Sequence, residues 1–227
     1  MIDTPDGPRA VEILRAGDLV LTVDHGPQNV RWVRSSEHAL EDAEIDDKPV
    51  LIQAAALGVG RPAQDLIVSP QHRILVGGGG QLIEYFKTEA FVPAKALTGL
   101  PGIRHMKGKA KITWIHFACQ RHEVVTANGC LSESLLLGPA VLNGLNREEW
   151  RTVVTAFEAI LHPSQNMCRD PARTILKVGE VRRLLATQAL ANSKGEKEIR
   201  KWNFDAAMEK FEADHMHFLE PSRAHNR

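Results

Sequence analysis

The stretch Asp65-Leu66-Ile67-Val68-Ser69-Pro70-Gln71-His72-Arg73-Ile74-Leu75-Val76 joins two apolar runs through a turn that contains proline. Each run is short and rich in aliphatic residues, which is typical of a buried strand. A histidine directly after a tight turn between buried strands projects from a rigid frame. Taken alone, His72 is most simply interpreted as a structural histidine. A catalytic role must therefore be argued from the rest of the chain.

Short runs of the same kind continue through the first 145 residues, separated by Gly, Pro or Asn. Many short strands at this spacing predict an all-β domain over residues 1–145. The acidic stretch 37–47 is expected to be a solvated loop or a short helix. The expected strands cover residues 18–23, 29–33, 50–53, 66–69, 73–76, 82–86, 91–92, 112–117 and 123–127.

The pattern changes near residue 145, and residues 146–227 are expected to form a helical extension. Asn146 with Glu149 three residues later is a capping-box pattern. Apolar residues then recur at helical spacing until Pro163. Two further helices are expected over about 178–192 and 196–215. We expect these helices to pack on the β domain or on a partner rather than to carry chemistry.

The chain has 227 residues, with 28 basic and 28 acidic side chains, so its formal net charge is zero. This balance argues against a nucleic-acid binder that depends on neutralising phosphates, and against a polybasic membrane-surface protein. No stretch approaches the ~20 apolar residues of a membrane helix. Three cysteines are too few for a disulfide framework. Nucleic acid and membrane are therefore not expected partners.

Two local patterns resemble a phosphate-binding loop and a zinc site, but neither fully matches the pattern that such a site requires. Residues 77–80 are all glycine, but the Lys-Ser/Thr of a phosphate loop does not follow, so a hairpin tip is expected. The spacing His116-x2-Cys119-x2-His122 resembles zinc-ligand spacing. On a strand, however, side chains alternate, so Cys119 would face away from both histidines. We therefore predict no cofactor and no metal site.

A hydrolytic triad is another alternative. Ser69, Ser132 or Ser134 can be paired with His72 or His122 and an acid. No Gly-x-Ser-x-Gly nucleophile elbow is present, and ten histidines make such pairings easy to find. The metal and hydrolase interpretations stay open as one further class of function.

Taken in order, the motifs of this chain resemble the Hint (Hedgehog/Intein) domain family, in its bacterial, alphaproteobacterial-type form. The resemblance covers residues 1 to about 145 and, more loosely, about 146–192. The ordered set is specific, whereas any one motif alone is not. The matching segments are 4–12, 14–22, 24–28 with Arg31-Trp32, 65–76, 92–97, and His116 with 122–134.

This resemblance implies a mainly β, horseshoe-shaped fold of antiparallel strands with an α-helical C-terminal extension. It also implies self-processing by an N-to-S acyl shift, in which a cysteine thiol attacks the carbonyl of the preceding peptide bond. The family places the proton donor for the amide nitrogen in a Thr/Ser-x-x-His motif, which here is residues 69–72. His72 is thus the expected catalytic residue, and Ser69 would hold the scissile peptide or orient His72. His122 is the expected helper in resolving the thioester.

Two departures from the family pattern limit the expected reaction. Inteins close with His-Asn followed by Cys, Ser or Thr, but this chain continues through Ser132-Glu133-Ser134 into its helical region. We therefore expect cleavage on the N-terminal side without splicing. The family's nucleophile lies in a Cys-Phe-x-x-Gly-Thr-x-Ile segment, of which Met1-Ile2 would be the end. The expected substrate is the domain's own upstream polypeptide, and the 227-residue chain by itself is expected to be inert.

A degenerate Hint domain that serves as a non-catalytic binding or structural module is the main alternative. Whether the chain is an enzyme, acting once as an autoproteolytic domain, therefore stays open. Scarce cysteines are typical of a reducing cytoplasm. Relatives are often attached to exported proteins, in which case the export signal would lie upstream, so the compartment is left open.

Overall fold

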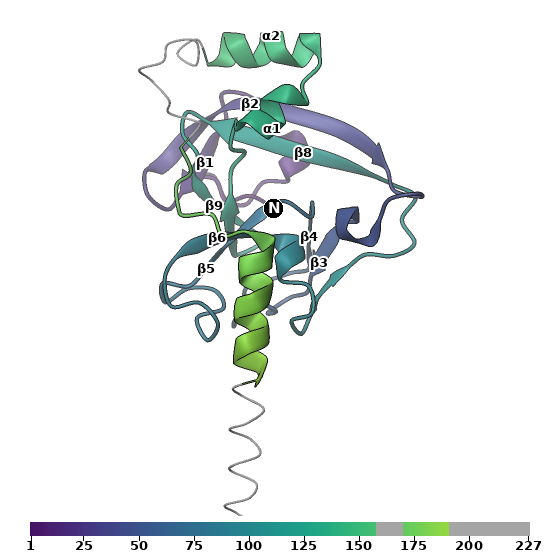
Figure 1. Ribbon diagram of the computed structural model, residues 1–227. Helices are drawn as coiled ribbons and strands as arrows, with labels where there is room; N and C mark the ends of the chain where they lie inside the picture. The colour runs from purple at the N-terminus through teal and green to yellow at the C-terminus, as the bar shows by residue number, and fades with distance from the viewer. Residues whose placement is uncertain (158–169, 191–227) are drawn as a thin grey trace, which may run out of the picture. The chain divides into compact units, whose positions relative to one another are not determined.

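The computed structural model describes residues 1–157 and 170–190, and its strands pair in an antiparallel manner (Figure 1). The chain divides into two compact units, residues 1–182 and 183–227. The expected fold class, mainly antiparallel β with helices towards the C-terminus, is confirmed. The expected helix over 196–215 lies outside the described residues. The domain boundary at residue 145 stays a prediction.

Two sheets form the first unit. The larger has the strand order β6-β5-β10-β9-β1-β2-β8, and the smaller has the order β4-β3-β7. The larger sheet contains β1 (Leu19–Thr22), β2 (Gly26–Ala39), β5 (Arg73–Val76), β6 (Ala90–Pro93), β8 (Lys111–Cys119), β9 (Val124–Ala127) and β10 (Cys130–Glu133). The smaller contains β3 (Val50–Ile52), β4 (Leu66–Val68) and β7 (Ile103–His105). Three short 3-10 helices are η1 (Val11–Ile13), η2 (Ile45–Asp47) and η3 (Ala94–Ala96).

The longest strand pair is β2 with β8, which run side by side in Figure 1. Their register extends from Ala39 opposite Lys111 to Val30 opposite Cys119, with a bulge between Val30 and Trp32. Both strands are longer than the runs 29–33 and 112–117 predicted from apolar residues alone. The strands are longer because cross-strand pairing with β8 also includes the polar end of β2, among it residues 37–39 of the acidic stretch.

The main apolar core lies against the middle of the larger sheet. Its buried side chains come from the chain start, from β1, β2, β8 and β9, and from the loop before β1. They are Ile2, Leu14, Val20, Val30, Phe117, Cys119, Val125 and Ala127. Burial of such side chains contributes about 1.5–3 kcal/mol each, so this cluster holds β1 and β2 against β8 and β9.

Two helices follow the last strand, α1 (Pro139–Asn143) and α2 (Arg147–Ala156). The predicted capping box is confirmed, because the Asn146 side chain accepts from the backbone N–H groups of Glu148 and Glu149, and Glu149 accepts from the Asn146 N–H. The α2 helix packs on β2, where the Trp32 indole donates to Thr152 at 2.9 Å. Residues 178–190 are also helical, close to the predicted range. None of the described helices is long and apolar enough to cross a membrane.

The strand predicted over residues 82–86 is wrong. Leu82 has a φ of 53°, and the Phe86 N–H donates to the Leu82 carbonyl at 3.0 Å, which closes a single turn. Both side chains are 3% exposed, so this turn buries them on one side where a strand would also have placed them. The glycines at 77–80 begin the connection from β5 to β6, which is longer than the expected hairpin tip and runs over residues 77–89. A Cβ on Gly77 would lie 2.1 Å from the Thr88 carbonyl oxygen, so that position requires glycine.

Candidate active site

The turn over residues 69–72 joins the smaller sheet to the larger one, because β4 precedes it and β5 follows it. The His72 N–H donates to the Ser69 carbonyl at 3.0 Å and closes the turn. Two N–H groups of η3 then support it from outside, from Ala94 to the His72 carbonyl and from Lys95 to the Pro70 carbonyl. His72 therefore stands on backbone that is held at both ends, as its position after a tight turn predicted.

A pocket of about 440 Å³ opens beside this turn. Its walls come from four elements that are distant in sequence: the 69–72 turn, β8, the end of β10 and the beginning of α1. The polar lining residues are Ser69, Gln71, His72, Arg73, His116, Glu133 and Ser134. Leucines 135 and 136 with Val141 supply much of the apolar wall. Such a mixture of apolar walls and converging polar groups is typical of a small-molecule or peptide site.

Two histidines of the pocket are neutral at neutral pH. Burial lowers the pKa of His72, although the nearby Glu133 charge opposes this. Burial, with the neighbouring His72 and Arg34 adding to it, lowers the pKa of His116 to about 4. A neutral imidazole carries one N–H to donate and one lone pair to accept. The pocket thus contains two groups that are able to accept or donate a proton.

Glu133 lies at the centre of the polar network. Its Oε2 accepts from Arg73 Nη1 at 2.7 Å and from His122 Nε2 at 3.0 Å, and its Oε1 accepts from the Arg73 backbone N–H at 2.9 Å. Burial opposes its ionisation, but His122, His72 and Arg73 hold the pKa of Glu133 below its usual value. The pocket therefore contains a fixed carboxylate next to two neutral histidines.

His122 lies behind Glu133 and does not line the pocket. Its side chain is fully buried, its ring packs against Phe91 at a centroid distance of 5.2 Å, and its Nδ1 accepts from the Ala172 N–H at 3.1 Å. Of the three predicted site residues, Ser69 and His72 share the pocket, whereas His122 reaches it only through Glu133. Their catalytic roles stay predictions.

Sequence reasoning did not assign Arg73 and Glu133 to this site, and it considered His116 only as a candidate zinc ligand. His116 lies within an apolar run of β8, whereas Arg73 follows His72 at the start of β5 and Glu133 stands between two serines at the end of β10. No local pattern marks Glu133, although a buried carboxylate requires a partner. The identity of that partner is not local, since Arg73 lies 60 residues earlier in the chain.

The described cysteines lie away from this pocket. Cys119 is buried in the core, and burial raises the pKa of the Cys130 thiol to about 12. Cys168 lies outside the described residues. Over residues 1–157 and 170–190, no three His, Cys, Asp or Glu side chains gather as metal ligands. In particular His116 lines the pocket, while Cys119 packs in the core.

The fold and the pocket together define a β-rich domain of two antiparallel sheets whose connecting turn presents a histidine. The family model described as the Hint domain matches residues 1–139, which is more than half of the chain. The chain therefore belongs to the Hint domain family, a family of self-processing domains that act within a larger polypeptide.

Several solved structures are similar to this chain, all at low sequence identity. The MchDnaB-1 intein shares 11% identity at a TM-score of 0.35, with 58% of this chain and 93% of that chain covered. A bacterial intein-like domain from Clostridium thermocellum shares 17% at a TM-score of 0.37, covering 59% of this chain and 94% of that one. The gp41-1 intein shares 16% at 0.32, with 58% and 91% covered. No curated protein matches the chain.

Proposed function

We propose that this chain is the self-processing domain of a longer polypeptide, and that the pocket beside the 69–72 turn binds the peptide bond to be cleaved. The reaction is an N-to-S acyl shift followed by cleavage on the N-terminal side. The observation that carries this proposal is the pairing of His72 and His116, both neutral, with the ionised Glu133 in one pocket. The substrate is the polypeptide that precedes the domain.

The chemistry assigns His72 to the proton transfer. His72, neutral at rest, takes the proton of a cysteine thiol, the thiolate attacks the carbonyl carbon of the preceding peptide bond, and the C–N bond breaks as the C–S bond forms. The amide nitrogen must gain a proton to leave. Burial lowers the pKa of His72, so its protonated form is a stronger acid than an ordinary imidazolium and gives the proton up readily. Water then hydrolyses the thioester.

The end of the β domain supports cleavage without splicing. Asparagine cyclisation needs a side-chain amide, but the corresponding stretch here ends in Glu133 and Ser134. The Glu133 carboxylate is engaged by Arg73 and His122, and Ser134 Oγ accepts from the Glu123 N–H at 2.9 Å. Neither side chain is able to cyclise and release the segment that follows.

A non-catalytic binding or structural module is the second candidate. It is favoured by the burial of Cys119 and Cys130, which leaves the pocket without a thiol from the described residues. The two candidates differ in what happens when a thiol is supplied before Met1.

The test supplies that thiol. A reporter protein is joined to a segment of the form Cys-Phe-x-x-Gly-Thr placed directly before Met1, and the fusion is incubated with dithiothreitol or hydroxylamine. We expect release of the reporter, measured by gel and mass spectrometry, because these nucleophiles resolve a thioester. His72→Asn should slow release by about a hundredfold or more, as expected for loss of general acid–base catalysis.

Matched controls separate the candidates. Replacing the added cysteine by alanine should abolish release, and His38→Asn on the exposed end of β2 should leave the rate unchanged. A fusion that folds and releases no reporter would favour the non-catalytic module. Release that persists undiminished in His72→Asn would remove His72 from the mechanism.

A further inference from the structure

Residues 172–176, named here the edge segment, lie along the outer edge of the larger sheet. The Phe91 N–H of β6 donates to the Thr174 carbonyl at 2.8 Å, and the Leu176 N–H donates to the Phe91 carbonyl at 3.0 Å. Phe91 and Ile175 form a parallel bridge. Because β6 is the last strand at its end of the sheet, the edge segment covers backbone groups that would otherwise be open to other strands.

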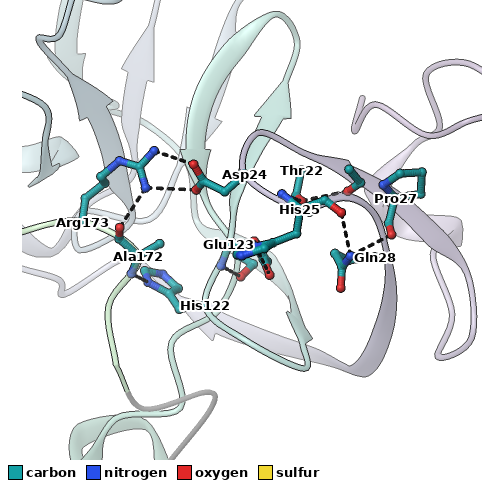
Figure 2. A network of polar contacts seen from close by, with 11 residues as sticks. Thr22, Asp24, His25, Pro27, Gln28, His122, Glu123, Ala172 and Arg173 are labelled. Carbon is teal, nitrogen blue, oxygen red and sulfur yellow. Dashed lines mark hydrogen bonds and ion pairs between the residues drawn. The ribbon is translucent and has the colours of Figure 1, made fainter.

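Arg173 fastens the edge segment through two carboxylates from different parts of the fold. Its guanidinium donates to both oxygens of Asp24 at 2.8 and 3.0 Å, and its Nε donates to Glu89. Asp24, which faces Arg173 in Figure 2, belongs to the turn between β1 and β2. Glu89 precedes β6. The Arg173 guanidinium also donates to the Ala172 carbonyl at 2.9 Å, which fixes the peptide that carries its own side chain.

Ala172, whose carbonyl is held in this way, also contacts a residue of the candidate active site through its N–H. The Ala172 N–H donates to Nδ1 of His122 at 3.1 Å, as Figure 2 shows. A ring nitrogen that accepts a hydrogen bond carries no proton, so the proton of the neutral ring lies on Nε2. Nε2 is the atom 3.0 Å from the Glu133 carboxylate, so His122 donates to Glu133.

The opposite tautomer would place a lone pair against a carboxylate oxygen and leave Glu133 dependent on Arg73 alone. A buried carboxylate that loses a donor is left with part of its charge uncompensated. It would then move or take up a proton, and the charge that faces His72 in the pocket would change. The tautomer of a buried histidine outside the pocket therefore bears on the proton chemistry inside it.

We propose that Arg173 is a positioning residue for the candidate active site: it holds the edge segment so that the Ala172 N–H selects the Nε2–H tautomer of His122, which orients Glu133. Self-processing, if it is the function as proposed above, therefore requires the edge segment to be docked. Residues 1–139 therefore do not complete the candidate active site by themselves. The edge segment, which follows α2 in the chain, must also be paired with β6.

The first test reads the tautomer and does not depend on activity. The full chain is labelled with nitrogen-15 histidine, and the His122 ring signals are identified by their loss in His122→Gln. We expect the wild-type ring to show a protonated Nε2 and an unprotonated, hydrogen-bonded Nδ1. In Arg173→Ala the Nδ1 signal should move away from this pattern towards an average of the two tautomers.

Arg182→Ala is the matched control, because Arg182 follows the edge segment in the chain and, like Arg173, makes a salt bridge, here with Asp46 at 3.3 Å on the surface. Its His122 signals should equal those of the wild type. Arg173→Lys keeps the charge but cannot reach both carboxylates with a planar fork, so its Nδ1 shift should be intermediate. If Arg173→Ala fails to fold, Arg173→Lys decides. Wild-type His122 signals in a folded Arg173→Ala or in Arg173→Lys would overturn the proposal.

The second test uses the reporter fusion. Arg173→Ala should slow release of the reporter roughly tenfold to a hundredfold, as expected when a site is misplaced slightly by a distant change. Arg182→Ala should release it at the wild-type rate, and an equal rate for Arg173→Ala would contradict the proposal. A fusion that never cleaves argues against the proposed function alone, because the His122 signals still decide the role of Arg173.

Discussion

Burying a carboxylate costs several kcal/mol unless charged or hydrogen-bonding groups replace the lost water. Glu133 is 8% exposed and receives three hydrogen bonds, two from Arg73 and one from His122. Removing one of these partners would leave a charge without compensation. The same carboxylate therefore serves as a structural link between β5, β10 and the loop before β9, and as the fixed charge of the pocket.

Thiol reactivity tests the placement of the cysteines. Burial raises the pKa of Cys130 to about 12, so at pH 8 its thiolate is roughly a thousandfold scarcer than that of an exposed cysteine. We expect iodoacetamide to leave Cys119 and Cys130 unmodified in the native chain and to modify both in urea, as measured by peptide mass mapping. Rapid native labelling of Cys130 would show that its thiol is accessible.

At the scale of single elements, α2 illustrates a prediction made from a few neighbouring residues. Asn146 and Glu149 are near in sequence, and their hydrogen bonds form as soon as the first turn exists, so the pattern identifies the helix start. The contact of α2 with β2 is different in kind. It joins Trp32 to Thr152 across 120 residues, and no local pattern indicates it.

The Asn146 helix cap contributes measurably to the stability of the folded chain. Asn146→Ala removes the acceptor for two N–H groups of the first helical turn and should lower the free energy of unfolding by about 1 kcal/mol in urea titrations. Asn143→Ala, at the exposed end of α1, is the matched control and should change it by less than about 0.5 kcal/mol. Equal effects of both variants would argue against the capping box.

At the scale of the whole molecule, the two half-buried histidines of the pocket make stability depend on pH. The unfolded chain protonates His116 near pH 6.5, about the value of a free imidazole, whereas the folded chain does so only near pH 4. Between these values the unfolded state binds more protons, so stability falls as the pH falls through this window. Burial lowers the pKa of His72 as well, which adds to the same trend.

The contribution of His116 to the pH dependence of stability can be measured separately. Between pH 7 and 4.5, urea unfolding should show that His116→Gln loses less stability than the wild type, by roughly 2–3 kcal/mol. His38→Gln, an exposed histidine on β2, should follow the wild type. If His116→Gln showed the same pH dependence as the wild type, the His116 imidazole of the wild type would protonate as readily in the folded chain as in the unfolded one.

Much of the fold was predictable because strands and turns leave local patterns. Asn128-Gly129 adopts positive φ at both residues and connects β9 to β10, as an Asn-Gly pair between apolar runs indicates. The failure at residues 82–86 has a local cause too. Leu82 and Phe86 are apolar at a spacing that a single turn also satisfies, so their pattern does not distinguish a turn from a strand.

The mainly β class, the turn that presents His72, the start of α2 and the family are all predictable from the amino-acid sequence, because each depends on neighbouring residues or on motifs in a fixed order. The contacts of Glu133 with Arg73 and His122, and of Arg173 with Asp24 across 149 residues, become known only from the folded chain. Charged side chains have many candidate partners in an unfolded chain. Burial in one arrangement of strands removes water from these charged side chains. Only the partners that this arrangement places beside them then remain to compensate their charge.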